Sequence, residues 1–401
     1  MMFAAALSTR ADPEEAVHEV IEQLHAQGAQ SEQNGADPAK SDSAGFDLAI
    51  VFFTHHHGGD ADSIAQTLQD ALGEPALIGC SCEGVIGQAR EVENTPGLSV
   101  LAARLPGVRV STFHISDDQW PAALASRDAL TDHLNIASDT RAIIGLGDPW
   151  TTPITHLLQR FGEITPAIPL IGGMASGARK AGENVILFNN ARFDEGMAGV
   201  AISGPVRVET VVSQGCRPIG QRFIVTKGQA NVIEQLGGKP ALTVLEQLVH
   251  SLTDAEKQLL SNGLLIGQAM SEYKETFARG DFVVRSIVGV DQSSKALGVG
   301  DRVRVGQTVQ FHVRDQVTAD EDLNHLLGAR QITSPSGALL FSCNGRGSRL
   351  FAKPHHDAQT AAKWMPDVPL AGFFAAGELG PVDGRNFIHG HTASFALFST
   401  P

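Results

Sequence analysis

Short apolar runs alternate with amphipathic stretches along most of the chain. Residues 47–54 (DLAIVFFT), 141–147 (RAIIGLG) and 337–343 (GALLFSC) are nearly continuous apolar runs, which is typical of strands covered on both faces. Residues 60–72 instead repeat their apolar side chains at helical spacing. The pattern therefore predicts an α/β (α+β) fold in which mixed sheets are covered by helices.

The same order of predicted elements occurs three times. A strand, a helix, a second strand that ends in a glycine turn, and a hairpin follow one another over residues 47–115 and 141–215. A shorter version spans residues 337–399. The segments LIGCSCEG (77–84) and LIGGMASG (170–177) occupy the same place in two of these copies. Because a period of about 90 residues is too long for a solenoid, we predict duplicated strand-helix-strand-hairpin units.

The remaining segments complete the predicted domain organisation. A capped, amphipathic helix is predicted over residues 12–28, and the polar residues 29–45 predict a surface loop. Two helices within residues 240–260 and three strands within residues 280–315 separate the second copy from the third. A boundary near residues 228–238 divides the chain into two predicted domains, residues 1–230 and 231–401.

Composition and charge exclude several classes of partner. The chain has 30 Lys and Arg against 44 Asp and Glu, a net charge of −14. A surface this acidic repels nucleic acid and anionic membranes, so we expect neither as a partner. No apolar run approaches the ~18 residues of a membrane span, and the N-terminus lacks the basic leader of a secretory signal. Four cysteines are too few for a disulfide framework, so a reducing, cytoplasmic location is expected.

The second strand of each unit runs into a glycine turn, over residues 79–87, 172–177 and 372–380. Glycine gives the backbone freedom and lets a ligand approach closely, and ligands of open α/β sheets bind at strand ends. Tight turns needed by the fold alone would also explain any one of these glycines. As three equivalent turns, they predict a shared ligand pocket, to which Gly377 would belong.

Charged residues inside otherwise apolar stretches are candidate ligand-binding side chains. Glu83 and Glu378 lie in such stretches, where a carboxylate must be paired or solvated. Facing a pocket, either could meet an amine or act as a general acid or base; a surface turn is the alternative. Arg346 lies between two glycines after a buried strand, close to Asn344, and it suits contact with a carboxylate or phosphate.

The cysteines and histidines give weaker evidence of chemistry. Cys343 would be a nucleophile only beside a base that lowers its pKa, and Cys80 is expected to be structural. The histidine pairs within residues 55–57 and 389–391 would share a face of an extended segment, and residues 355–356 form a third cluster. No HExxH or CxxC motif anchors a metal among them. We therefore predict no metal site and assign no catalytic residue.

Taken together, these motifs resemble the FIST family. LIGCSCEGVIG (77–87) is similar to the Gly-Cys-Ser-x-x-Gly motif of its N-terminal domain. FSCNGRG (341–347), PLAGFFAAGELGP (369–381) and FIHGHT (387–392) follow the order of its C-terminal signature. The resemblance covers roughly residues 45–400. One departure is Gly390 before His391, where the family often has Asn.

The resemblance implies a sensory module for small ligands, proposed to include amino acids, that occurs in signal-transduction proteins. Some members of the family have been linked to haem and nitric-oxide sensing. The chain shows no attached kinase, receiver or F-box pattern, so we expect a stand-alone protein whose partners are a small molecule and a signalling protein. The candidate ligand-binding residues are Arg346, Glu378, Asn344, His391, Cys80, Glu83 and Gly377.

The leading hypothesis is therefore a cytoplasmic sensor without a cofactor, whose ligand is an amino acid. Arg346 would hold the carboxylate, Glu378 or Glu83 would meet the amine, and amides of the glycine turns would complete the pocket. Two alternatives stay open. One is a hydrolase in which Cys343 or Cys80 cooperates with His391, or in which a carboxylate acts. The other is a haem or nitric-oxide sensor.

Overall fold

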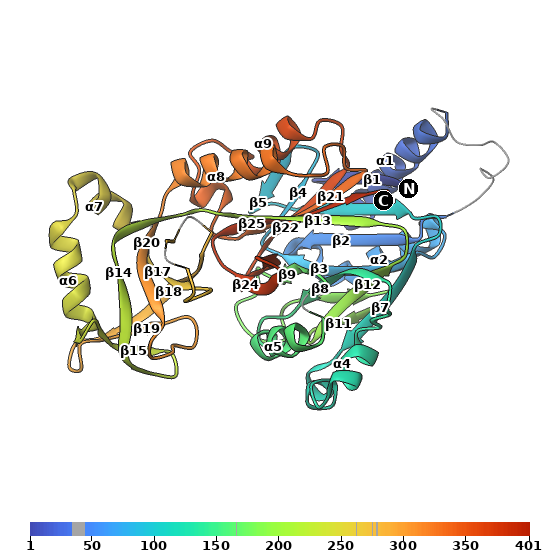
Figure 1. Ribbon diagram of the computed structural model, residues 1–401. Coiled ribbons are helices and arrows are strands. Elements are labelled where there is room, and N and C mark those ends of the chain that lie inside the picture. The colour runs from blue at the N-terminus through green and yellow to red at the C-terminus, as the bar shows by residue number, and fades with distance from the viewer. Residues whose placement is uncertain (34–44, 166, 262, 275, 278–279) are drawn as a thin grey trace. The chain divides into compact units, whose positions relative to one another are not determined.

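Strands and helices alternate along the chain, and the described strands form four sheets (Figure 1). The structure is a computed structural model that describes residues 1–33, 45–165, 167–261, 263–274, 276–277 and 280–401. The chain forms two compact units: unit 1 consists of Met1–Val212, Asn324–Ile388 and Thr392–Pro401, and unit 2 of Ser213–Leu323 and His389–His391. The predicted mixed α/β fold is confirmed.

Three six-stranded sheets share one plan. In spatial order, the first sheet is β1 (Met2–Ser8), β6 (Leu98–Arg104), β2 (Leu48–Thr54), β3 (Ala76–Cys82), β10 (Ile186–Phe188) and β11 (Ala191–Phe193). The second is β24 (Arg385–His389), β23 (Glu378–Val382), β9 (Leu170–Met174), β8 (Thr140–Gly147), β12 (Met197–Ser203) and β7 (Arg109–Ile115). The third is β13 (Arg207–Gln214), β25 (Thr392–Ser399), β21 (Gly337–Cys343), β22 (Leu370–Ala375), β4 (Gly84–Gly87) and β5 (Arg90–Glu93).

The same pairing recurs in these three sheets. Each has one parallel pair, namely β2 with β3, β8 with β9, and β21 with β22. An antiparallel strand flanks the first member of each pair, namely β6, β12 and β25. The second member pairs with a short strand from another copy: β3 with β10, β9 with β23, and β22 with β4. The three sheets are therefore interlinked by exchanged strands.

The two strands of each predicted hairpin are also divided between different sheets. A tight turn forms at Pro106-Gly107, where the Val108 N–H donates to the Leu105 carbonyl (3.0 Å). The strands on either side of it, β6 and β7, nevertheless belong to different sheets, and β7 pairs with β12. Strands β12 and β13 are likewise divided between two sheets. Local sequence specifies the turn, whereas the pairing partner is set by which apolar faces meet in the core.

One glycine of each predicted turn is explained by strand packing. Gly79, Gly172 and Gly372 lie at matching registers of the three parallel pairs, opposite Val51, Gly145 and Leu340. A Cβ atom at any of these glycines would overlap the carbonyl oxygen of the residue opposite. These three glycines therefore allow neighbouring strands to approach closely, and that packing explains them without a ligand.

Helices cover the outer faces of the sheets in unit 1 (Figure 1). One buried cluster joins α1 (Pro13–Gln33) and α2 (Ala61–Leu72) to β1, β2 and β6, and another joins α3 (Trp120–Ala123), α4 (Arg127–His133) and α5 (Ile154–Ile164) to β7, β8 and β12. The inner faces of all three sheets share a third cluster. Within it the Phe52 and Phe373 rings stack at 4.9 Å, and Phe341 packs edge-on to both.

Unit 2 has its own sheet and its own core. Its strands run in the order β14 (Cys216–Gln229), β20 (Thr308–Arg314), β17 (Leu264–Ala269), β18 (Phe282–Asp291), β19 (Ala296–Val299), β15 (Val232–Leu236) and β16 (Lys239–Pro240), and β14 also pairs with β15. The helix α6 (Ala241–Ser251) packs its apolar face on this sheet. A capping box of Thr253 and Glu256 begins α7 (Asp254–Leu260).

Several elements differ from the sequence-based predictions. The first helix does not end at Gly28 but continues to Gln33, and the rest of the predicted loop, residues 34–44, lies outside the described residues. The strand β1 and the helix α8 (Gln316–Ala329) were not predicted. The division into domains 1–230 and 231–401 stays a prediction. The boundaries of the two compact units lie at other positions in the chain. No helix of the described part is both long and apolar enough to cross a membrane.

Candidate functional site

The segment after β21 directs an arginine into the protein interior. Asn344 is tied to the next strand by its N–H, which donates to the Ala375 carbonyl (2.9 Å). The Arg346 N–H then donates to the Cys343 carbonyl (2.8 Å), which closes a tight turn before the 3₁₀ helix η4 (Gly347–Arg349). As a result the Arg346 side chain is 0% exposed, and it is the largest of the fully buried side chains described.

Asp357 neutralises this buried arginine. Its two carboxylate oxygens accept hydrogen bonds from Nε and Nη2 of Arg346, both at 2.7 Å, in a bidentate pair. Ser342 Oγ also donates to Asp357 (2.8 Å), and His356 Nδ1 lies 2.9 Å from it. Burial by itself would raise the pKa of Asp357, but the Arg346 charge and these hydrogen bonds hold that pKa well below its usual range.

Glu91, a residue of β5, caps the beginning of α9 (His356–Trp364), the helix that carries Asp357. Its Oε1 accepts the N–H groups of Asp357 (2.8 Å) and Ala358 (3.0 Å), which have no partner within the helix. Burial and the neighbouring Asp357 charge raise the pKa of Glu91 to about 7. Glu91 is therefore partly protonated at neutral pH.

Glu378, the first residue of β23, is the second buried glutamate. Its Oε2 accepts two hydrogen bonds from Thr392, one from the backbone N–H (3.1 Å) and one from Oγ1 (2.7 Å). Burial raises the pKa of Glu378 to about 8, although Thr392, Arg346 and Cys343 all act to lower it. The carboxyl group is therefore mostly neutral at pH 7.

We call Glu91, Cys343, Arg346, Asp357 and Glu378 the buried charge cluster, since their charges act on one another. Three buried polar atoms of the cluster have no hydrogen-bond partner among the described residues: Arg346 Nη1, Glu378 Oε1 and Glu91 Oε2. An unpaired polar atom inside a protein costs about 1–3 kcal/mol. Such atoms mark a place where a ligand or a water molecule can complete the hydrogen bonding.

Of the predicted ligand-binding residues, the structure brings Arg346 and Glu378 together in this cluster. Asn344 and Gly377 lie next to it along the chain. Glu83 is joined to the same region through Arg349, whose guanidinium forms an ion pair with Glu83 and donates to the Asn344 carbonyl (2.7 Å). Glu83 is therefore already paired with a cation.

The three glycine turns, for which a shared ligand pocket was predicted, contact one another through hydrogen bonds within the protein. Ser176 Oγ accepts the Glu83 N–H (2.9 Å) and donates to the Phe374 carbonyl. The Met174 N–H donates to the Gly377 carbonyl (2.8 Å). Protein atoms therefore occupy the contacts between the turns, and a ligand pocket formed by the turns themselves stays a prediction.

Cys80 and His391 are not members of the buried charge cluster. Cys80 is fully buried in the apolar core of unit 1, and burial raises the pKa of its thiol far above the usual value. This environment does not favour a nucleophile. His391 belongs to unit 2, where its carbonyl accepts the Gly215 N–H (3.0 Å) and its ring lies 3.5 Å from Ser286 Oγ. Its role in ligand binding stays a prediction.

The other histidine clusters make local contacts within the protein. Residues 55–57 begin the 3₁₀ helix η2 (His55–Asp60), so the expected extended arrangement of these rings is wrong. His355 Nδ1 accepts the Glu91 N–H (3.0 Å), and the His356 ring stacks on Phe351 at 3.5 Å. Within the described part of the chain, no three His, Cys, Asp or Glu residues are grouped so that they could hold a metal ion. The expectations about haem and other cofactors remain predictions.

Sequence reasoning missed three members of the site. Asp357 opens a short helix, and Thr392 begins the closing strand, where each would be expected to serve only local structure. Glu91 lies in the exposed-looking segment REVE and gives no signal in the sequence. Their roles come from contacts with residues far along the chain, which a single sequence does not reveal.

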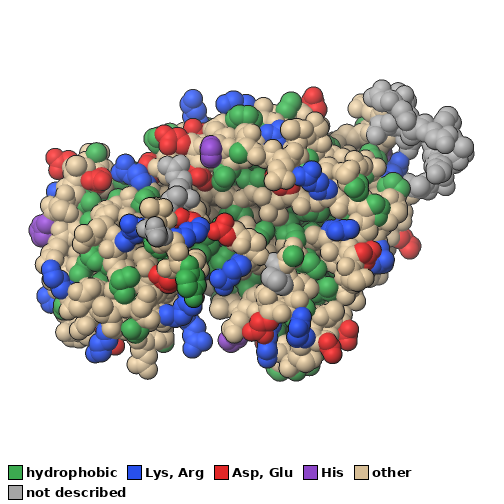
Figure 2. Space-filling model, in the orientation of Figure 1, with side chains coloured by type: hydrophobic (Ala, Val, Ile, Leu, Met, Phe, Trp, Pro, Cys, Tyr) green, Lys and Arg blue, Asp and Glu red, His purple; other side chains and the backbone are tan. Residues whose placement is uncertain are grey.

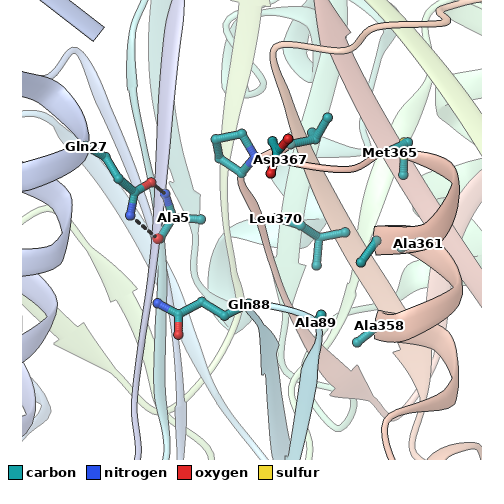
Figure 3. A pocket seen from close by; sticks show the side chains of 12 residues that line it. Ala5, Gln27, Gln88, Ala89, Ala358, Ala361, Met365, Asp367 and Leu370 are labelled. Carbon is teal, nitrogen blue, oxygen red and sulfur yellow. Dashed lines mark hydrogen bonds between the residues drawn. The ribbon is translucent and has the colours of Figure 1, made fainter. Parts of the chain in front are cut away.

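A pocket of about 270 Å³ lies elsewhere in unit 1, between β1, the β4–β5 turn and α9 (Figure 3). Its walls are mainly apolar and include Ala361, Met365 and Leu370. Gln27 lines it but is held by two hydrogen bonds to the backbone of Ala5, at 3.0 and 2.8 Å. None of the predicted ligand-binding residues lines this pocket, so it does not belong to the candidate site.

Charged side chains of both signs are mixed on the surface. Figure 2 shows Lys and Arg side chains interspersed with Asp and Glu side chains over the face in view. The exclusion of nucleic acid and membrane partners still rests on the net charge of −14, and it stays a prediction.

Comparison with known proteins gives two matching family models and several relatives. The model described as FIST N domain matches residues 47–239, and the FIST C domain model matches residues 241–381. An uncharacterised protein of Mycobacterium tuberculosis (strain ATCC 25618 / H37Rv) is 36% identical over 401 residues, 99% of this chain and 100% of that protein. An uncharacterised Mycobacterium bovis protein is 37% identical over 354 residues, 88% of this chain and 90% of that protein.

Solved structures give a much weaker likeness. A cyanuric acid hydrolase from A. caulinodans matches at a TM-score of 0.37 and 10% identity, covering 100% of this chain and 99% of that chain. A second cyanuric acid hydrolase structure matches at a TM-score of 0.32 and 10% identity, covering 100% of both chains. Similarity this low carries no argument about the present chain.

Proposed function

We propose that the chain, which belongs to the FIST family and whose domains suggest a sensory role, is a cytoplasmic sensor of a small ligand. The ligand class we propose is the amino acids. The proposed site is the buried charge cluster, with Arg346 and Glu378 as the binding side chains. Ligand binding there would be reported to a signalling protein.

One observation carries this proposal. Arg346 Nη1 and Glu378 Oε1 are both fully buried, and neither has a hydrogen-bond partner among the described residues. Arg346 is held in place by Asp357, so its remaining N–H groups are oriented before any ligand arrives. A guanidinium with oriented N–H groups is suited to bind a carboxylate, which every free amino acid carries.

The location of the site suggests how binding could be reported. Arg346 lies in the segment after β21, and Glu378 begins β23, so a ligand that touches both connects two separate parts of the chain. The next arginine, Arg349, forms an ion pair with Glu83 near the surface. A shift of this segment on ligand binding would therefore also move Arg349 and its ion pair with Glu83, which lies near the surface.

Thermal unfolding with each of the twenty amino acids tests the proposal. A ligand present at one hundred times its Kd adds about 2.7 kcal/mol to the free energy of unfolding, which raises Tm by several degrees. We expect at least one amino acid to stabilise the protein and this effect to be lost in Glu378→Leu. The matched control is Glu163→Leu, since Glu163 is an exposed residue of α5.

The proposal would be contradicted if no amino acid raised Tm at concentrations well above a millimolar Kd. It would also fail if the stabilisation survived unchanged in Glu378→Leu, because the ligand would then bind elsewhere. Far-UV circular dichroism of each variant checks that the fold is retained.

A further inference from the structure

The hydrogen bonds of Glu378 are distributed unequally over its two oxygens. Oε2 accepts both hydrogen bonds from Thr392, at 3.1 and 2.7 Å, whereas Oε1 has no partner among the described residues. The residue is 0% exposed, so water on the surface cannot solvate the second oxygen. In an ionised carboxylate, Oε1 would carry negative charge without a donor, which is costly in a buried place.

A proton on Oε1 removes this problem. Oε2 then remains an acceptor for Thr392, and Oε1 becomes a neutral hydroxyl that can donate. Burial acts in the same direction, since it raises the pKa of Glu378 to about 8. The titratable side chains that act on this carboxyl are Arg346, through its charge, and Cys343, through a hydrogen bond, and both lower its pKa without overcoming burial. Glu378 is therefore mainly a donor at neutral pH.

Arg346 supplies the second donor of the site. Its Nε and Nη2 bind Asp357, and Nη1 is left with no partner in the described part of the chain. An amine placed at Glu378 would bring a second cation close to this guanidinium, which is unfavourable in a buried cluster. An oxygen acceptor brings no second cation, and an oxygen that reached both atoms would accept hydrogen bonds from Nη1 and from a protonated Oε1.

We propose that the ligand presents a carboxylate to Arg346 Nη1 and Glu378 Oε1, and that Glu378 takes part as a neutral acid rather than as a counter-ion for an amine. The inference rests on the proposed function for the location of the site. It differs from the sequence-based hypothesis, in which Glu378 meets the amine of the ligand. Binding of the carboxylate then requires the proton on Glu378 to remain in place.

Two small probes distinguish the two roles of Glu378. Acetate carries only the carboxylate, and methylammonium only the cation. We expect acetate to raise the Tm of the full-length protein at pH 6.5, and methylammonium to have no effect beyond that of salt. Above pH 8 the affinity for acetate should fall about tenfold for each pH unit, as Glu378 ionises. Methylammonium binding, or no binding of acetate, overturns the inference.

The variant Glu378→Gln provides a sharper control, because a glutamine amide keeps the shape of the neutral acid and still donates. We expect Glu378→Gln to bind acetate at pH 6.5 and to keep that affinity up to pH 9.5. Loss of acetate binding at pH 6.5 in this variant overturns the inference, since a neutral donor would then not be enough.

The protonation of Glu378 can also be measured without any ligand. Carbon-13 NMR of protein labelled at the glutamate carboxyl carbons reports each titration, and the Glu378 signal is the one that is missing from Glu378→Gln. We expect it to titrate near pH 8. Titration below pH 6 overturns the inference while the proposed function still stands, because amino-acid binding is tested separately by Tm.

Discussion

At the scale of residues, the buried charge cluster depends on one ion pair. Arg346 and Asp357 are both 0% exposed, and they are joined by two hydrogen bonds of 2.7 Å. Removing water from two charges is unfavourable, and their attraction offsets this only while both partners are present. The pair thus holds the arginine in position for a ligand, and it leaves each partner dependent on the other.

Asp357→Asn should therefore lower the free energy of unfolding by about 3–5 kcal/mol, since it leaves Arg346 as an uncompensated buried charge. The double variant Arg346→Met/Asp357→Leu should recover much of this loss because it removes both charges. Urea denaturation measures both values, with Asp194→Asn at an exposed position as the control. A loss below about 1 kcal/mol for Asp357→Asn would show that water reaches the pair.

At the scale of elements, the two strands of each parallel pair approach one another closely at an equivalent glycine. Gly79, Gly172 and Gly372 each lie against a backbone carbonyl of the neighbouring strand, with no room for a Cβ atom. Backbone atoms cannot move aside as the end of a flexible side chain can. Packing between strands therefore explains some of the 42 glycines of the chain.

Gly372→Ala should lower the free energy of unfolding by about 1–3 kcal/mol or more, because the added methyl group overlaps the Leu340 carbonyl. The matched control is Gly162→Ala, in the exposed part of α5, where the added Cβ meets nothing within 4 Å. That change should instead raise stability by about 0.5–1 kcal/mol. Urea denaturation of the two variants compares them directly, and equal effects would contradict the close approach of the strands.

At the scale of the whole molecule, each unit has its own hydrophobic core. The clusters that join the first three sheets and their helices belong to unit 1, and another cluster belongs to unit 2. The long inserted segment of unit 2 begins and ends at one place, since Ser213 Oγ and the Gln214 N–H both donate to Asp322, at 2.9 and 2.8 Å. A short connection can therefore replace the segment between these ends.

A chain in which residues 216–320 are replaced by a Gly/Ser linker of about six residues should keep unit 1 folded. We expect a cooperative thermal transition and hydrogen-exchange protection of β2, β8 and β21, which form the centres of the three sheets. The full-length protein is the reference for both measurements. Loss of the cooperative transition would show that unit 1 depends on unit 2 for its stability.

The sequence by itself determined the kind of elements and their order. Apolar runs located β2, β8 and β21, because strands buried on both faces must be apolar along their length. Charged residues inside apolar stretches identified Arg346 and Glu378, because burying a charge requires a specific reason. The motifs around them also identified the family. These properties are local, so a single sequence reports them.

Only the tertiary structure decided which elements and side chains are partners. Local periodicity reports that a strand is buried but not which strand lies beside it, so the exchange of β4, β10 and β23 between sheets could not be predicted. The same holds for the cluster, where Glu91 accepts hydrogen bonds from residues 266 and 267 positions further along the chain. The neutral state of Glu378 likewise arises from its burial in the folded chain, which outweighs the opposing hydrogen bonds from Thr392 on another strand.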